Sequence, residues 1–141
     1  PVRRVRLIDA AIDEIVRHPD ADSLRSVAWP AQTPYKMWRI GGDGYLEPLV
    51  RLKDVAEPYS MPRQMLPEVF WQNGYVDVIR SRTILEQGSM AGRRIVPFVV
   101  NEPNYEIDYL DNVPVVEAAL RGLEAGDDGA AGDPAPRRYP V

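Results

Sequence analysis

Cysteine is absent from the 141 residues, and histidine occurs once, at position 18. The lack of cysteine excludes disulfides, thiolate zinc sites and thiol nucleophiles. His18 precedes a proline near the expected end of a helix, where a solvated side chain is favoured over a catalytic one. Chemistry in this chain must therefore use carboxylates, Lys, Arg, Tyr and an oxygen-ligated ion such as magnesium.

Long apolar runs and basic clusters are also missing. No run approaches the ~20 apolar residues that a membrane span needs, and the N-terminal sequence is amphipathic, unlike the core of a signal peptide. The 21 acidic residues outnumber the 17 basic ones, and no Lys/Arg cluster is present to follow a phosphate backbone. The hydrophobic content of 45% suits one globular domain. We therefore expect a soluble cytoplasmic protein with no nucleic-acid or membrane partner.

The apolar pattern predicts alternating helices and strands. Apolar residues recur every three or four positions over 3–17, which predicts a helix with one buried face that ends before Pro19. The other predicted elements are strands at 23–27, 75–80 and 93–100 and helices at 81–88 and 111–122. This alternation favours an α/β fold with a mostly parallel sheet.

A hairpin is expected to protrude from the sheet within residues 31–67. Two strand-like segments, YKMWRI and YLEPLV, flank the sequence GGDG. GGDG lacks the Lys-Ser/Thr of a phosphate loop and no helix follows it, so we interpret it as the hairpin turn. Prolines at 58, 62 and 67 prevent a regular element in the rest of this arm. Residues 123–141 have few apolar side chains, and we expect a disordered tail there.

The segment YEIDYLD at 105–111 suggests a metal site. Glu106 and Asp108 are two residues apart, so both side chains would point the same way from an extended backbone. Two carboxylates on one side suit magnesium, which bridges protein oxygens and substrate phosphates. The alternative is that Glu106 faces solvent and that Asp108 or Asp111 caps the last helix.

Four further residues are candidates for binding a substrate. Arg63 and Gln64 lie between prolines in MPRQMLP, where a guanidinium grips a carboxylate at low entropic cost; a surface salt bridge is the alternative for Arg63. Lys36, in TPYKM, is either a ligand or a surface charge. Asn73 precedes Gly74 in a dipeptide typical of tight turns, and a ligand-facing role is the alternative.

The order of several segments resembles one enzyme family. PVRRVRLIDAAID, DSLRSV, TPYKM, PRQMLPEVFWQNGYVDVIR and YEIDYLDNVPVVEAA follow one another as in the acylneuraminate cytidylyltransferases, also called CMP-sialic acid synthetases. The resemblance covers residues 1–122, and its most specific part is PRQ-x-LP followed by Asn-Gly and a strand. It implies a Rossmann-like nucleotidyltransferase domain that joins CTP to a nonulosonic acid for surface glycan synthesis and releases pyrophosphate.

The resemblance also implies roles for particular residues. Glu106 and Asp108 match the two metal carboxylates, which implies Mg²⁺ as cofactor and Asp108 as a catalytic residue, although the family usually has Asp at the first position. Lys36 and Arg63 match basic residues that face the sugar, commonly from the neighbouring subunit. This follows because residues 31–67 are similar to the family's dimerisation arm. A homodimer is therefore expected.

Two features depart from the family. Its Gly-rich basic CTP-binding segment and the strand with a QPTSP-like end lie upstream of the matched residues, so we expect an incomplete domain that is inactive by itself. Asp77 stands near where the family often places an aromatic sugar contact, which leaves the sugar open. One alternative is the related cytidylyltransferase for 3-deoxy-octulosonic acid, which the sequence NGYVDVI after PRQMLP disfavours. The other is a non-catalytic dimerisation or sugar-binding remnant.

Overall fold

The computed structural model describes residues 2–124 of the chain, which form two compact units. The sheet unit comprises residues 2–28 and 72–124. The hairpin unit comprises residues 29–71. In the described part of the chain, no helix has both the length and the apolar character needed to cross a bilayer.

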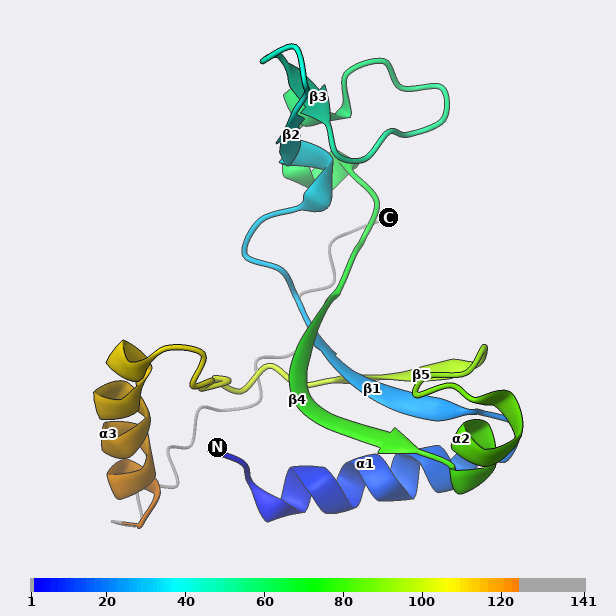
Figure 1. The fold of residues 1–141 in the computed structure, drawn as a ribbon, viewed down its shortest axis with the longest axis vertical. Coiled ribbons are helices and arrows are strands. Elements are labelled where there is room, and N and C mark those ends of the chain that lie inside the picture. The colour runs from blue at the N-terminus through cyan, green and yellow to red at the C-terminus, as the bar shows by residue number, and fades with distance from the viewer. Residues whose placement is uncertain (1, 125–141) are drawn as a thin grey trace. The chain divides into compact units, whose positions relative to one another are not determined.

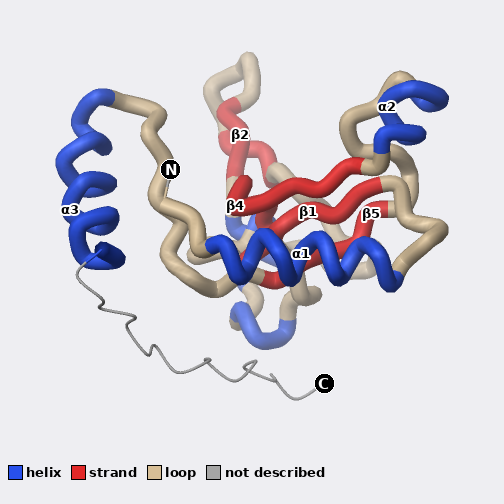
Figure 2. The backbone as a smooth tube through the Cα atoms, turned by 90° about the horizontal axis from the view of Figure 1, so that it is seen from below, coloured by secondary structure: helices blue, strands red, loops and turns tan. Residues whose placement is uncertain are grey.

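The sheet unit is a three-stranded sheet with helices, as expected for an α/β fold (Figure 1). The strand order is β4-β1-β5, and α1 lies along one face of the sheet in both views (Figure 2). In chain order the elements are α1 (Val5–Arg17), β1 (Ser23–Ala28), β4 (Trp71–Ile79), α2 (Ser81–Gln87), β5 (Ile95–Val99) and α3 (Val113–Glu124).

The core lies between α1 and the sheet. Ala11 and Ile15, four residues apart on one face of α1, pack with Ala21 and Leu24. Alternating side chains of the outer strands pack against this cluster: Val76, Val78, Val96 and Phe98. The predicted periodicity of the first helix is thus confirmed, and the helix ends at Arg17, with His18 as its C-cap before Pro19.

The sheet is mixed, which corrects the prediction of a mostly parallel sheet. β1 and β5 are parallel, with Ser23 opposite Ile95 and Val27 opposite Val99. β4 runs against β1: the Val76 N–H donates to Ser26 Oγ (2.9 Å), whereas the Arg80 N–H donates to the Asp22 carbonyl (3.1 Å). The chain leaves β1 into the hairpin unit and returns from it directly into β4. Without a crossover helix, two consecutive neighbouring strands pair in opposite directions.

The hairpin unit contains the predicted hairpin. β2 (Trp38–Ile40) and β3 (Leu46–Pro48) are antiparallel, and Ile40 pairs with Leu46 across the Gly-rich turn. Pro34 and Pro58 begin the short 3₁₀ turns Pro34–Lys36 and Pro58–Ser60, and Pro62 precedes a third, Arg63–Met65. Aromatic rings pack in two pairs, Trp29 with Phe70 at 4.5 Å and Trp38 with Tyr59 at 4.4 Å between centroids.

Several boundaries differ from the predictions. Lys36 ends a 3₁₀ turn that begins at Pro34, where we expected a strand, because proline favours the first position of such a turn. β4 begins at Trp71, four residues before the predicted start at 75. α3 extends to Glu124, two residues past the predicted end; the rest of the predicted tail, 125–141, lies outside the described residues.

Asp22 ties β1 to the segment before β5. Its carboxylate accepts hydrogen bonds from the backbone N–H groups of Arg94 (2.9 Å) and Arg93 (2.7 Å) and from Nε2 of Gln87 (2.8 Å). These donors lower the pKa of Asp22 to about 2. Because this folded-state pKa lies below the unfolded value of about 3.9, the carboxylate stabilises the fold fully above that value. The stabilisation is lost as the pH falls through about 2.

Asp22→Asn should therefore lower the urea midpoint of unfolding near neutral pH and have less effect at low pH. The amide keeps one acceptor oxygen but loses the charge that the three donors stabilise. Circular dichroism during urea titration, from about pH 6 to about pH 2, should show the two midpoints converging. Asp20→Asn is the matched control, because Asp20 is exposed and its ion pair within residues 2–124 is with the exposed Arg94. A constant gap between wild type and Asp22→Asn at every pH would contradict this assignment.

Candidate functional site

The candidate site begins at Asn73 and Gly74, which lie inside β4 (Trp71–Ile79). The tight turn predicted ahead of the strand is not formed, and the backbone turns at Gly74 within the strand instead. Gly74 has a φ of +62°, a left-handed conformation that favours glycine. The Asn73 side chain is 2% exposed. Its Nδ2 donates to the Val100 carbonyl (3.2 Å), and its Oδ1 accepts from the Tyr75 N–H (3.2 Å). The Asn73 side chain therefore points into the protein, and its two hydrogen bonds fix the backbone around Gly74.

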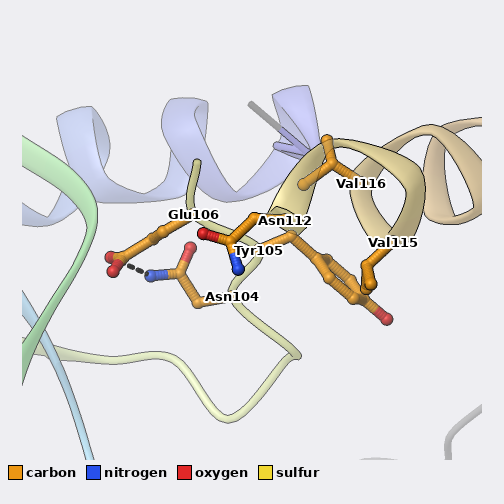
Figure 3. A pocket seen from close by; sticks show the side chains of 6 residues that line it. All are labelled: Asn104, Tyr105, Glu106, Asn112, Val115 and Val116. Carbon is orange, nitrogen blue, oxygen red and sulfur yellow. Dashed lines mark hydrogen bonds between the residues drawn. The ribbon is translucent and has the colours of Figure 1, made fainter. Parts of the chain in front are cut away.

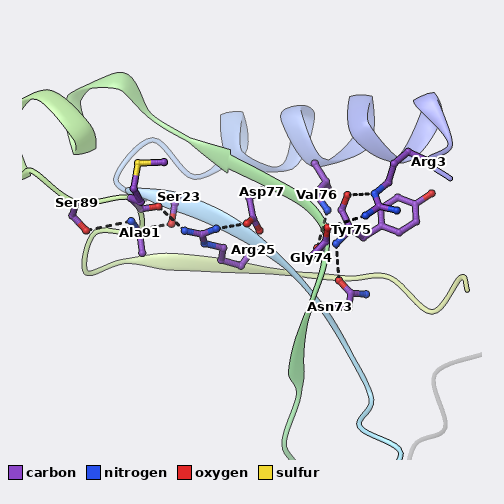
Figure 4. A network of polar contacts seen from close by, with 12 residues as sticks. Arg3, Ser23, Arg25, Asn73, Gly74, Tyr75, Val76, Asp77, Ser89 and Ala91 are labelled. Atoms are coloured by element: carbon purple, nitrogen blue, oxygen red, sulfur yellow. Dashed lines mark hydrogen bonds and ion pairs between the residues drawn. The ribbon is translucent and has the colours of Figure 1, made fainter. Parts of the chain in front are cut away.

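The first residues of the chain hold the other side of this turn (Figure 4). Nη2 of Arg3 donates to the Gly74 carbonyl (3.1 Å), and Nε donates to the Tyr75 carbonyl (2.7 Å). The Arg3 guanidinium also lies 4.7 Å from the centre of the Tyr75 ring. The Tyr75 hydroxyl accepts from the backbone N–H of Arg4 (2.8 Å). No sequence signal had marked Arg3, because its partners are more than seventy residues away.

Asn104 connects the turn to Glu106 (Figure 3). Its Nδ2 donates both to the Asn73 carbonyl and to Glu106 Oε1, the latter at 2.8 Å. A Cβ placed on Gly74 would lie 3.3 Å from the same Oε1. Glu106 therefore sits against the turn that Asn73 shapes, and the structure brings these two predicted residues together.

A pocket of about 250 Å³ opens beside Glu106 (Figure 3). It combines polar groups with an apolar wall, and its lining residues are Asn104, Tyr105, Glu106, Asn112, Val115 and Val116. Oδ1 of Asn104 is buried and has no hydrogen-bond partner among the described residues. Such a buried acceptor is costly unless a ligand, an ion or water satisfies it.

The Asp108 carboxylate is exposed, and within residues 2–124 it makes no hydrogen bond or ion pair. The Asp108 and Tyr109 N–H groups donate to Oδ1 of Asn112, at 3.2 and 3.0 Å. Asn112 thus stabilises the turn before α3. The alternative expectation, that Asp108 or Asp111 caps this helix, is not met, since neither carboxylate accepts such a bond in the described part.

Glu106 and Asp108 carry the kind of oxygen that magnesium binds, although Asp108 is not among the residues that line the pocket. Glu106 offers Oε2, which has no partner among residues 2–124, and Asp108 offers an exposed carboxylate two residues further on. No group of three or more His, Cys, Asp or Glu side chains suited to a metal occurs in the described residues. Magnesium does not require one, because it is commonly held by one or two carboxylates together with water and substrate phosphates.

The other three predicted residues belong to the hairpin unit. Arg63 donates from Nη1 to the Ala31 carbonyl (2.8 Å) and from Nη2 to the Pro30 carbonyl (2.5 Å). Its partners are therefore backbone carbonyls, and the salt bridge considered for Arg63 is not formed with any described residue. Gln64 lies beside it in the same 3₁₀ turn, and both Gln64 and Lys36 are exposed.

Asp77, the position that departs from the resemblance, forms an ion pair with Arg25. Nη1 of Arg25 contacts Asp77 Oδ2, and Nη2 of Arg25 donates to the Met90 carbonyl at 2.6 Å (Figure 4). Both side chains are less than one-third exposed. The pair thus joins β1 to β4 across the sheet and accounts for Asp77 in structural terms.

Comparisons with known proteins give no assignment: no family model matches the sequence, and no curated protein matches it either. The structure defines a small α/β unit with a pocket that combines the Glu106 carboxylate with amide, aromatic and apolar side chains.

Proposed function

We propose that the chain supplies the metal-carboxylate and sugar-binding part of a cytidylyltransferase that transfers CMP from CTP to a sialic-acid-like nonulosonic acid. The observation that carries the proposal is the Glu106 carboxylate held against Gly74, with the Asp108 carboxylate, which has no partner within residues 2–124, two residues further on. The proposal includes a Rossmann-like nucleotidyltransferase fold, a cytoplasmic enzyme and a role in surface glycan synthesis. It rests on these contacts together with the segment order described above.

The proposed reaction is a substitution at the α-phosphorus of CTP. The anomeric oxygen of the sugar forms a bond to that phosphorus, the bond to the bridging oxygen of the β-phosphate breaks, and pyrophosphate leaves with the bonding electrons. The proton of the anomeric hydroxyl passes to solvent. A magnesium ion bound by Glu106 and Asp108 would neutralise charge on the phosphates. No existing contact of the Asp108 carboxylate has to break for it to bind an ion, because it is exposed and has no partner in residues 2–124.

The hairpin unit is proposed to contribute the sugar contacts. Arg63 uses two nitrogens on the Pro30 and Ala31 carbonyls, which fixes the guanidinium in place. A guanidinium has five N–H donors, so further donors remain for the sugar carboxylate. Gln64 beside it and the exposed Lys36 offer additional donors. In the proposed homodimer these residues act at the neighbouring subunit's site.

Self-association through the hairpin unit follows from its exposed apolar side chains. Ile40, Tyr45 and Leu46 are 74%, 75% and 60% exposed, and they lie together on the β2-β3 hairpin. Leu46→Glu should weaken dimerisation at least about tenfold, because each chain of a twofold interface carries the change. Analytical ultracentrifugation over a concentration series measures the dissociation constant.

Leu85→Glu is the matched control for this prediction. Leu85 is 83% exposed on α2 of the sheet unit, so the same change of charge falls outside the hairpin. A dimer that withstands Leu46→Glu but dissociates with Leu85→Glu would place the interface elsewhere. A wild-type chain that stays monomeric at high concentration would contradict the proposed homodimer.

The metal site itself is tested by titrating the ¹⁵N-labelled chain with Mg²⁺ and following its amide signals by NMR. We expect saturable shifts at Gly74 and at residues 104–108, because these groups surround Glu106. The same titration with Na⁺ at equal ionic strength should leave these signals unchanged. Shifts confined to other carboxylates, or none at millimolar Mg²⁺, would remove the observation that carries the proposed function.

A further inference from the structure

We propose that Asn104 is the positioning residue of this site: it holds Glu106 against the turn at Gly74, so that the carboxylate is oriented before a metal ion arrives. This inference rests on the proposed function and extends it to a residue that touches neither substrate nor reacting atoms. Its physical basis is the way a single amide group connects two segments of the sheet unit that are far apart in sequence.

The Asn104 amide has two N–H hydrogens, and both are directed at oxygen acceptors. One is used by the backbone carbonyl of Asn73 and the other by Glu106 Oε1 at 2.8 Å. An alanine at this position would supply no donor and could not make this bridge. The carboxylate of an aspartate would instead face two acceptors without a hydrogen to share. The donor pair therefore explains why an asparagine suits this position.

The turn that receives Glu106 is itself fixed. Asn73 is buried and bonded through both ends of its amide, and Arg3 binds the two carbonyls that follow. The hydrogen bond from Asn104 already restricts the Glu106 side chain in the folded protein. Binding an ion therefore costs this side chain little additional conformational entropy. Glu106 Oε2 makes no hydrogen bond or ion pair with residues 2–124, so this oxygen is available to a metal.

Gly74 completes the arrangement from the other side. Its φ of +62° disfavours any other residue, and an added Cβ would lie 3.3 Å from Glu106 Oε1. That distance is tight enough that the carboxylate must move. Gly88, the residue after α2, has a similar φ of +59°, but nothing lies within 4 Å of its added Cβ. The two glycines share the backbone strain and differ in the contact with Glu106.

The first test replaces Asn104 with alanine and compares it with Asn101→Ala. Asn101 is exposed on the same segment and makes no side-chain bond to a described residue. We expect Asn104→Ala to weaken Mg²⁺ binding by about ten- to a hundredfold in the NMR titration, as loss of a metal ligand's supporting partner typically does. Asn101→Ala should bind Mg²⁺ as the wild type does.

The second test compares Gly74→Ala with Gly88→Ala, in case Asn104→Ala fails to fold. Both changes should lower the urea midpoint by similar amounts, because both force alanine into the left-handed region. Only Gly74→Ala should weaken Mg²⁺ binding. In the active enzyme, the Asn104 variant should need more Mg²⁺ for half-maximal turnover and should regain turnover at high Mg²⁺, which a change that merely destabilised the fold would not do.

The outcomes separate this inference from the proposed function. If the wild type shows no Mg²⁺-dependent shifts at residues 104–108, the proposed metal site fails and the positioning role with it. If the wild type binds Mg²⁺ there and both Asn104→Ala and Gly74→Ala bind it equally well, the positioning role alone is overturned. Weaker binding in those two variants, with normal binding in Asn101→Ala and Gly88→Ala, is the expected result.

Discussion

Asp108→Asn is expected to reduce cytidylyltransferase turnover by roughly a hundred- to a thousandfold, because metal-assisted charge stabilisation contributes several kcal/mol at a phosphoryl-transfer transition state. The amide keeps the shape of the side chain but removes the charge that attracts the ion. The fold should be unaffected, since the carboxylate is exposed and has no partner in the described residues. Turnover is measured against Mg²⁺ concentration in an enzyme that joins these residues to a CTP-binding segment.

Two further variants sharpen this prediction. Glu106→Gln should have a similar but smaller effect, because the amide can still accept from Asn104 and water can replace one contact to the ion. Asp111→Asn is the matched control: it removes an exposed carboxylate three residues away and should leave turnover unchanged. Near-normal activity of Asp108→Asn at low Mg²⁺ would remove Asp108 from the metal site.

Leu24→Ala should destabilise the sheet unit by about 3 kcal/mol, within the usual range for a buried leucine. Leu24 is fully buried at 0% exposure and packs with Ala11, Ile15 and Ala21 between α1 and the sheet. Two of these three neighbours are alanines, which have no side-chain freedom with which to fill the cavity. A loss of this size is a large part of the total stability of about 5–15 kcal/mol that domains typically have.

The control for this prediction is Leu85→Ala. Leu85 is 83% exposed, so its removal should change the free energy of unfolding by less than about 0.5 kcal/mol. Both values come from urea denaturation followed by circular dichroism. A Leu24→Ala protein as stable as the wild type would mean that α1 does not pack on β1 as described.

Much of the local structure could be predicted from the sequence, because short-range patterns determine it. The apolar spacing located α1, and the strand-like segments around GGDG located the β2-β3 hairpin. The direction of β4 could not be predicted, because periodicity is the same for parallel and antiparallel strands. Direction depends on how the chain returns from the hairpin unit, which is a property of the whole connection.

The site was predicted only in part, for a related physical reason. Glu106 and Asp108 were proposed from their spacing, whereas the contacts that hold Glu106 involve residues far apart in the chain, as when Asn104 reaches Asn73. One local contact does exist, because Asn104 and Glu106 are two residues apart and their side chains are hydrogen bonded. The partner of Arg63 was missed because surface arginines bond to backbone carbonyls as readily as to carboxylates, and sequence cannot distinguish the two.

Product analysis tests the proposed activity most directly. An enzyme in which these residues are joined to a CTP-binding segment is incubated with CTP, Mg²⁺ and a nonulosonic acid, and both products are quantified. We expect CMP-sugar and pyrophosphate in equal amounts, neither product when the sugar or Mg²⁺ is omitted, and far less product with 3-deoxy-octulosonic acid. Failure of every nonulosonic acid to yield CMP-sugar, or pyrophosphate release at the same rate without a sugar, would contradict the proposal.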